Sequence, residues 1–216
     1  MNSILRKNIL FFLLFSLPFL LPGKEKGEIP ASFQEYDLNI PYREEALGIL
    51  FPGKLGGFTK RFVRMNANEN IGTMIHYDSP GGFSLDIYIY SAPPLPGEAS
   101  GGFLLRNYRA ARKLLFSMEQ EKKREDMPER EELFFRDENI SAPQNFPCAS
   151  FSFTAGEEIF RSILAMTVLE KGNIRRLLKI RFSLPAEQET RGRKKWELFR
   201  KELLPLLFPP EKEKKS

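Results

Sequence analysis

The chain has 216 residues, of which 42% are hydrophobic and 28% are charged. This composition is typical of a globular domain and excludes a disordered chain or a membrane protein with several spanning helices. Cys148 is the only cysteine and His76 the only histidine. These counts exclude an internal disulfide, a two-histidine metal site and a Cys/His zinc cluster, so we expect neither a metal nor a cofactor.

Residues 1–23 have the three-part layout of a secretory signal. Arg6 and Lys7 give a positive start, and Ile9–Leu21 is an uncharged run of 13 residues, whereas spanning a bilayer takes roughly 20. The Pro22–Gly23 pair ends the run but matches the small-residue cleavage pattern poorly. We expect export to the periplasm or the cell surface, with an uncleaved N-terminal anchor as the alternative.

The net charge of +5 is unevenly distributed along the chain. Residues 191–216 carry nine basic and four acidic side chains, so the region from 24 to 190 is slightly acidic. The excess of basic residues is therefore confined to the C-terminal segment and does not extend over the whole surface. An exported protein is also separated from the nucleic acid of the cell. We therefore expect no nucleic-acid partner.

The chain is expected to contain one folded domain, over residues 49–208. Residues 24–48 are polar and interrupted by prolines, which favours a linker. Residues 209–216 are rich in lysine and glutamate and are expected to form a charged mobile tail.

The first strand is expected over residues 57–65, with Phe58 and Phe62 on one side. Residues 72–78 and 83–90 then predict a hairpin with its apolar side chains on one face. A two-residue turn would put the two apolar rows on opposite faces. We therefore expect the three-residue loop Ser79-Pro80-Gly81, with Gly81 in the left-handed conformation.

A helix is expected over Phe103–Arg124, because apolar residues recur there every three or four positions. Its inward residues are Leu104, Tyr108, Ala111, Leu115 and Met118, and its solvated face carries Arg106, Arg109 and Lys113. Four strands are expected to follow, over residues 131–137, 147–155, 159–170 and 174–184, with a turn at residues 171–173.

The run 159–170 is apolar on both faces, which favours a central strand covered on both sides. In the run 174–184, Lys179, Arg181 and Ser183 alternate with apolar residues and are expected on a wet face. A last helix is expected over residues 187–204, with Trp196, Phe199 and Leu203 inward. Pro205 is expected to end it, and residues 206–208 to return to the sheet.

This order predicts an α+β fold. We expect an antiparallel sheet of about six to seven strands with the two main helices packed on one face.

Catalytic motifs for nucleotide, hydrolase or metalloprotease chemistry are absent from the sequence. His76 is expected near Ser84 or Asp86 in a solvent-facing polar row of the hairpin. These three residue types invite comparison with a hydrolase triad, but strand residues lie flat and no glycine-rich turn offers an oxyanion hole. Cys148 is expected to be a small buried hydrophobic residue. We therefore expect no catalytic residues, and a hydrolase-like enzyme using His76 is kept as an alternative.

Two surfaces are candidates for binding a partner. Tyr88 and Tyr90 project with Asp86 from the non-core face of the hairpin, which suits either partner recognition or cover by a helix. The C-terminal basic segment with Arg193, Lys194 and Lys195 suits a solvated helix face or an anionic partner.

Several motifs together are similar to a recurring set of uncharacterised exported bacterial proteins. They are Phe51-Pro-Gly-Lys-Leu-Gly-Gly-Phe58, Ile75-His-Tyr77, Asp86-Ile-Tyr-Ile-Tyr90 and Leu178-Lys-Ile-Arg-Phe-Ser-Leu-Pro185. The order of strands and helices also resembles the PsbP/Mog1-like α+β sandwich. This resemblance implies a non-enzymatic binding or assembly factor.

The sequence thus predicts an exported, non-catalytic binding or envelope-assembly accessory protein. Its expected partner is another envelope or extracellular protein, and an anionic membrane surface is a second possibility. An alternative is a surface adhesin that binds host proteins through the lysine-rich C-terminus.

Overall fold

The computed structural model describes residues 33–34, 40–66, 70, 72–120, 130–132, 146–155 and 158–209. The strands in these residues are β1 (Phe33–Gln34), β2 (Tyr42–Glu44), β3 (Ile49–Phe51), β4 (Lys54–Leu55), β5 (Phe58–Met65), β6 (Thr73–Ser79), β7 (Phe83–Tyr90), β8 (Arg130–Glu132), β9 (Cys148–Ala155), β10 (Glu158–Lys171) and β11 (Ile174–Pro185). The helices there are α2 (Ser100–Gln120) and α3 (Glu189–Leu207), and a 3-10 turn at Ala186–Gln188 leads into α3.

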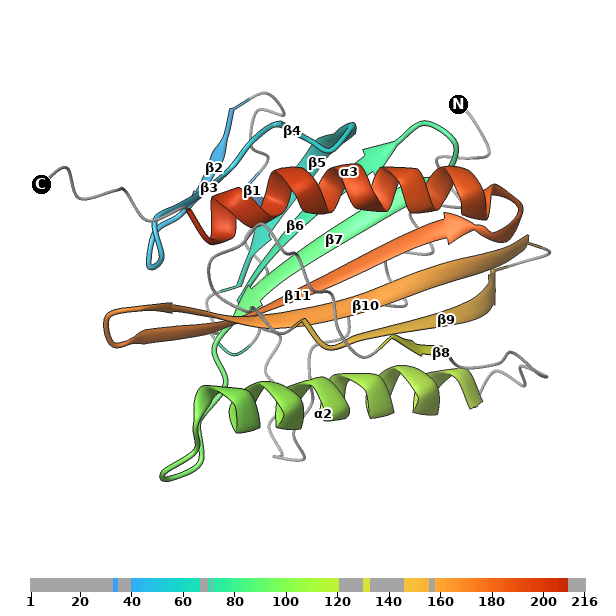
Figure 1. Ribbon diagram of the computed structural model, residues 1–216. Coiled ribbons are helices and arrows are strands. Elements are labelled where there is room, and N and C mark those ends of the chain that lie inside the picture. Colours follow the sequence, from blue (N-terminus) through green and yellow to red (C-terminus); the bar gives the residue numbers. More distant parts are fainter. Residues whose placement is uncertain are drawn as a thin grey trace, which may run out of the picture.

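One antiparallel sheet forms the centre of the molecule (Figure 1). Among the described residues its order is β1-β5-β6-β7-β11-β10-β9-β8, with β4 also paired to β5. Strands β5, β6, β7, β9, β10 and β11 are seven to fourteen residues long and make up its body. The predicted α+β class, with an antiparallel sheet and two helices, is confirmed.

The two helices cover opposite faces of the sheet, so the expectation that both pack on one face is wrong. Leu178 on β11 belongs to the hydrophobic cluster that contains Phe199 of α3, whereas the adjacent Leu177 belongs to the cluster that contains Phe103 of α2. In Figure 1, α3 crosses in front of β5, β6 and β7, and α2 lies below β8 and β9. Because β10 is apolar on both faces, each face needs its own cover. We call these two sides of the sheet the α3 face and the α2 face.

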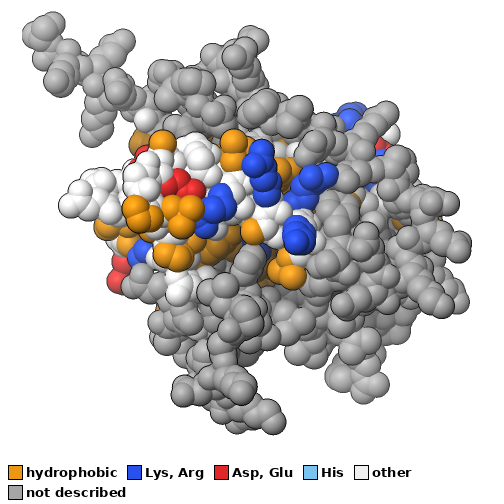
Figure 2. Space-filling view, turned by 90° about the horizontal axis from the view of Figure 1, so that it is seen from below, with side chains coloured by type: hydrophobic (Ala, Val, Ile, Leu, Met, Phe, Trp, Pro, Cys, Tyr) orange, Lys and Arg blue, Asp and Glu red, His pale blue; other side chains and the backbone are white. Residues whose placement is uncertain are grey.

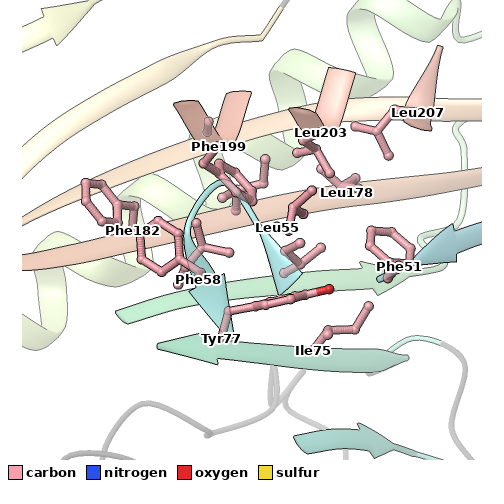
Figure 3. Packing of buried hydrophobic residues seen from close by; sticks show 14 of the residues in the cluster. Phe51, Leu55, Phe58, Ile75, Tyr77, Leu178, Phe182, Phe199, Leu203 and Leu207 are labelled. Carbon is pink, nitrogen blue, oxygen red and sulfur yellow. The ribbon is translucent and has the colours of Figure 1, made fainter. Parts of the chain in front are cut away.

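Aromatic rings fill the core on the α3 face. The ring centroid of Phe182 on β11 lies 5.9 Å from that of Phe58 and 5.6 Å from that of Trp196. Phe199 contacts both Phe58 and Trp196, at 6.2 and 5.6 Å. Figure 3 shows Phe58, Phe182 and Phe199 converging between the sheet and the helix. Trp196, Phe199 and Leu203 are buried, as the helical spacing predicts.

The α2 face has a smaller core next to α2. Leu104, Tyr108 and Ala111 of the helix are buried there, as predicted. The side chains of Leu115 and Met118 lie outside the described residues. So do residues 121–124 of the expected helix and residues 133–137 of the strand that was expected over 131–137.

A β-bulge in β5 sends Phe58 and Phe62 to opposite faces, although the sequence predicts them on one side. Lys60 pairs with Tyr77 and Phe62 with His76, so Arg61 is an extra residue in the ladder. An extra residue reverses the alternation of the side chains that follow it. Phe58 therefore lies in the α3-face core, while the ring of Phe62 stacks on His76 on the α2 face.

The β6–β7 hairpin has the predicted three-residue loop, displaced by one position. Ser79 pairs with Phe83, so the loop is Pro80–Gly82 and not Ser79–Gly81. Gly81 and Gly82 both have positive φ angles, which explains why two glycines stand here. The expected face matching is confirmed, because Ile75 pairs with Ile87 on the buried face.

The folded part begins before residue 49. Strands β2 and β3 form a separate two-stranded sheet, and Tyr42 and Leu47 are buried in the α3-face core. Residues 42–48 of the expected linker are therefore part of the domain, because an apolar residue among polar ones can still anchor a short hairpin. Residues 24–32 and 35–39 lie outside the described residues.

Helix α3 continues through Pro205 to Leu207, so the expectation that this proline ends the helix is wrong. Leu203, Leu204 and Leu207 are buried on both sides of it, and the N–H of Phe208 donates to the carbonyl of Leu204 at 2.8 Å. Pro205 itself is exposed. Apolar burial of the last turn therefore outweighs the hydrogen bond that the proline removes.

Candidate functional site

The outward side of α3 carries basic side chains around one leucine. Trp196 and Phe199 lie on the side of the helix that packs against the sheet, so residues on the other side of the helix face solvent. Arg191, Lys194, Leu198 and Lys201 all lie on this side and all are exposed, with Leu198 at 46%. We call these four residues the outer stripe.

The glutamates of α3 are already engaged with other groups. Glu189 binds Arg161 at 3.1 Å and Arg193 at 2.9 Å, and Glu197 binds Arg200 at 3.4 Å. Glu202 accepts a hydrogen bond from the N–H of Gly56 at 2.6 Å. Within the part of the chain that the structure describes, Lys194 and Lys201 make no hydrogen bond or ion pair. The outer stripe therefore carries an excess of positive charge around the exposed side chain of Leu198.

The structure places the three predicted basic residues of this helix in different surroundings. Arg193 pairs with Glu189 one helical turn earlier, at 2.9 Å. Lys194 lies on the outer stripe. Lys195 turns toward the sheet, where its Nζ donates to the Oγ of Ser79 at 2.6 Å. Of the three, only Lys194 offers its charge to a partner without giving up another contact.

Lys195 helps to hold α3 over the β6–β7 hairpin. Its ammonium lies 5.3 Å from the ring centroid of Phe58 and 5.4 Å from that of Phe83. Burial lowers the pKa of Lys195, and the positive charge of Arg191 lowers it further. Cation–π contact with two rings stabilises the charged form against this loss of hydration.

Tyr88 and Tyr90 lie half-buried on the α2 face, where the second predicted surface was placed. Tyr90 packs against the cluster that includes Phe103 and Tyr108 of α2. Tyr88 pairs with Lys179 of β11 in the strand register. Burial raises the pKa of both hydroxyls, and the charge of Asp86 also raises that of Tyr88. Cover by a helix, one of the two expectations for this face, accounts for Tyr90.

His76 lies opposite Asp86, as the hairpin register predicts, but it does not face solvent. Its Nδ1 is 2.7 Å from Oδ1 of Asp86, and only 4% of the residue is exposed. The ring of Phe62 stacks on the imidazole at 4.9 Å between centroids. The expectation of a solvent-facing polar row is therefore wrong, because the bulge in β5 brings Phe62 over the histidine.

Arg181 continues the polar row on β11, opposite Asp86. Its Nε donates to the Oγ of Ser162 at 3.3 Å, and Ser162 in turn bonds to Ser183 at 2.8 Å. The guanidinium also lies over the ring of Phe151, 5.7 Å from its centroid. Arg181 is only 7% exposed, so the expectation that this face of β11 is wet is wrong for Arg181 and Ser183.

The strand register separates Ser84 from the His76–Asp86 pair. Ser84 lies opposite Asp78 on one side and Ser183 on the other, two residues along β7 from Asp86. The three residues of the hypothetical triad therefore occupy two different rows of the sheet. Cys148 is a free, buried thiol, as predicted.

The outward side of α2 also carries basic residues. Figure 2 shows lysine and arginine side chains gathered beside hydrophobic ones on the side where α2 lies. Arg106 donates to both carboxylate oxygens of Glu98, at 2.9 and 2.8 Å, and this contact is the main reason that the pKa of Glu98 falls to about 2. Arg109 and Lys113 are exposed, as expected for a solvated face.

No model of a known protein family matches the chain, and no curated protein sequence matches it either. Among the residues described here, no helix is long and apolar enough to cross a membrane. No group of three or more His, Cys, Asp or Glu side chains in these residues is placed to hold a metal ion.

Sequence reasoning missed two residues that matter for the sites. Leu198 is exposed at the centre of the outer stripe, and the spacing of Trp196 and Phe199 already places it on the opposite side of the helix. The ammonium of Lys179 lies over the rings of Tyr88 and Tyr90 on the α2 face, and this could not be predicted because it depends on the pairing of β7 with β11.

Proposed function

We propose that the protein is an exported, non-catalytic binding or assembly accessory protein that docks on an acidic protein surface through the outer stripe. The observation that carries the proposal is the charge arrangement on α3. All three glutamates of the helix are engaged, while Lys194 and Lys201 flank the exposed Leu198 without a partner among the described residues.

The chemistry of the outer stripe favours a protein partner over a lipid or nucleic-acid partner. A helix that binds a membrane surface needs an apolar side to insert, and the apolar side of α3 is already buried against the sheet. Nucleic acid would require a longer series of phosphate contacts than three cations supply. One exposed leucine within a ring of charges resembles the centre of a protein interface with its polar rim.

Reversal of two charges tests this surface. We expect Lys194→Glu combined with Lys201→Glu to weaken binding of the chain to poly-L-glutamate by about 10- to 100-fold at low salt, because attraction becomes repulsion at two contacts. The matched control is Arg109→Glu with Lys113→Glu on α2, which changes the net charge by the same amount. It is expected to lose less than about threefold in affinity by fluorescence titration.

Equal losses in the two double variants would contradict a specific surface on α3. Binding of the parent chain to vesicles of 30% phosphatidylglycerol, lost in the α3 variant, would favour a membrane surface and contradict the protein partner.

The proposed export rests on the charge and length pattern of residues 1–23. We expect the protein recovered from fractionated cells to lie in the envelope or medium and to begin after residue 23. N-terminal sequencing of that fraction is the measurement. An intact N-terminus in the membrane fraction would favour the uncleaved anchor, and an intact N-terminus in the cytoplasm would contradict export.

The alternatives remain predictions. The lysine-rich tail of the proposed adhesin falls on residues 210–216, which lie outside the described part of the chain. A hydrolase-like role for His76 would need substrate to reach an imidazole that is buried beneath Phe62. The resemblance to exported bacterial proteins and to the PsbP/Mog1-like fold agrees with the proposal and is likewise a prediction.

A further inference from the structure

The connection between β7 and α2 contains the run Pro93-Pro94-Leu95-Pro96, which we call the proline loop. All four residues are exposed. No large hydrophobic residue in the described part of the chain is more exposed than Leu95, at 55%. Figure 1 shows this connection projecting away from the sheet where α2 begins, and Figure 2 shows hydrophobic side chains gathered on the same side of the molecule. The proline loop therefore presents an uncharged, apolar surface to solvent.

The sequence restricts the backbone of the proline loop. Each proline ring fixes its own φ angle near about −65°. Ala92, Pro93 and Leu95 each precede a proline, which disfavours the helical conformation and favours an extended one. These restrictions favour a polyproline II segment, which has about three residues per turn and no internal hydrogen bonds. Pro93 and Pro96 are three residues apart, so they share one edge of such a segment.

A tight turn ends the proline loop. The N–H of Glu98 donates to the carbonyl of Leu95 at 3.0 Å, and Gly97 between them has a φ of +72°. Proline in the second position and glycine in the third are the residues that a type II turn favours. The carboxylate of Glu98 also accepts the N–H of Leu95 at 3.0 Å. Both backbone groups of Leu95 are thus bonded to Glu98, and its side chain is left at the corner of the turn.

Arg106 fastens the proline loop to α2. Its guanidinium donates to both carboxylate oxygens of Glu98, at 2.9 and 2.8 Å. The Nη2 atom also donates to the carbonyl of Pro93 at 3.0 Å. Arg106 therefore joins the first residue of the loop to the residue that holds Leu95. Because the loop is already ordered, it loses little conformational entropy when it binds a partner.

We propose that the proline loop is a docking site for a partner protein whose groove is lined with aromatic side chains. Proline rings pack well on aromatic rings, and a preformed polyproline II segment binds such grooves at a low cost in entropy. Within the described part of the chain, the carbonyl of Pro94 accepts no hydrogen bond, so a tyrosine or tryptophan of the partner can donate to it. The loop lies beside α2 and the outer stripe lies on α3, so this proposal does not depend on the proposed function.

The composition of the proline loop favours a protein partner over a membrane. Insertion into a bilayer surface needs a broad apolar face with several large side chains. The proline loop offers a single large side chain, that of Leu95, and the charged pair of Glu98 and Arg106 lies directly behind it. The groove of a protein needs only a short apolar segment with a fixed shape.

Titration of the full chain onto purified WW and SH3 domains, whose grooves are lined with aromatic residues, tests the proposal. We expect saturable binding to at least one of these domains, with a Kd of about 10 to 500 µM by surface plasmon resonance. Pro93→Ala combined with Pro96→Ala should weaken this binding at least about 10-fold. The matched control is Pro41→Ala, at an exposed proline before β2, which should change it by less than about twofold. Absence of saturable binding to every domain, or equal effects of the two variants, would overturn the proposal.

Glu98→Ala separates a preordered loop from a merely apolar one. This substitution keeps the prolines and Leu95 but removes the contacts with Arg106, so binding should weaken by about three- to tenfold in a chain that circular dichroism shows to be folded. Unchanged binding in the folded variant would contradict the proposed preorganisation. Binding of the parent chain to phosphatidylcholine vesicles, lost in the double proline variant, would favour a membrane and contradict the protein partner.

Discussion

Replacing Gly56 with alanine is expected to lower the free energy of unfolding by at least about 4 kcal/mol or to prevent folding. Gly56 has φ +58° in the turn between β4 and β5, and a Cβ there would lie 2.3 Å from Cα and 2.6 Å from N of Phe199. The obstacle is the backbone of α3, which cannot rotate away as a side chain can. The helix would have to move off the sheet, and the bond from the N–H of Gly56 to Glu202 would be lost with it.

The neighbouring glycine provides a matched control for this substitution. Gly57 also has a positive φ, of +78°, but a Cβ there would meet nothing nearer than Nζ of Lys195 at 3.9 Å. Gly57→Ala should therefore cost only the strain of a left-handed alanine, about 1 to 2 kcal/mol. Urea denaturation followed by circular dichroism measures both. Equal losses at the two positions would contradict the close approach of α3 to the β4–β5 turn.

Phe182→Ala is expected to lower the free energy of unfolding by about 3 to 5 kcal/mol. Phe182 is fully buried on β11, and its ring lies among those of Phe58, Phe83 and Trp196. Removal of this ring leaves a cavity that the backbone of a central strand cannot close. Trp196 is the only tryptophan and stacks on Phe182 at 5.6 Å, so its fluorescence reports both the local change and the unfolding transition.

The same substitution at the end of α3 serves as its control. Phe208 is half-buried and contacts Phe146 edge to face at 6.1 Å. Phe208→Ala should cost about 1 to 2 kcal/mol, because less apolar area returns to water and the site can relax. A loss at Phe182 no larger than that at Phe208 would mean that the aromatic cluster does not dominate the core of the α3 face.

Local patterns in the sequence predicted most of the elements. The alternation of apolar residues located β6, β7 and β11, and a run that is apolar on both faces located β10. Helical spacing identified Tyr108 of α2 and Trp196 and Phe199 of α3 as buried. These features depend on residues close together in the chain. The requirement that both apolar rows of the β6–β7 hairpin share one face also predicted its three-residue loop. The predicted position of the loop was wrong by one residue, because both Gly81 and Gly82 accept a positive φ.

The features that the sequence did not predict depend on distant parts of the chain. Pairing of β7 with β11 brings Arg181 beside Asp86 and Lys179 beside Tyr88, and no local pattern reveals it. The bulge after Lys60 places Phe62 over His76, and the buried Lys60 side chain donates to the distant backbone carbonyl of Ile40. Which face each helix covers follows from the same long-range order, so the burial of His76 and Arg181 could not be predicted.

The candidate docking surface was predicted only in part. The basic character of α3 is plain in the sequence, but ion pairs decide which charges remain available. Arg193 is neutralised by Glu189 and Lys195 is directed to Ser79, whereas Lys201 and Leu198 join Lys194 on the outer stripe. Because Glu189 and Ser79 engage Arg193 and Lys195, only a small part of the basic segment is available to bind a partner.

Amine labelling of the protein in its native cell extract is the most direct test of the outer stripe. The extract and the purified protein are treated with isotopically distinct acetylating reagents, and the extent of labelling is compared at each lysine. We predict that Lys194 and Lys201 are labelled several-fold less in the extract, while Lys113 on α2 is labelled equally in both samples. Equal labelling of Lys194 and Lys201 in the two samples, or protection of Lys113 instead, would contradict the proposed docking surface.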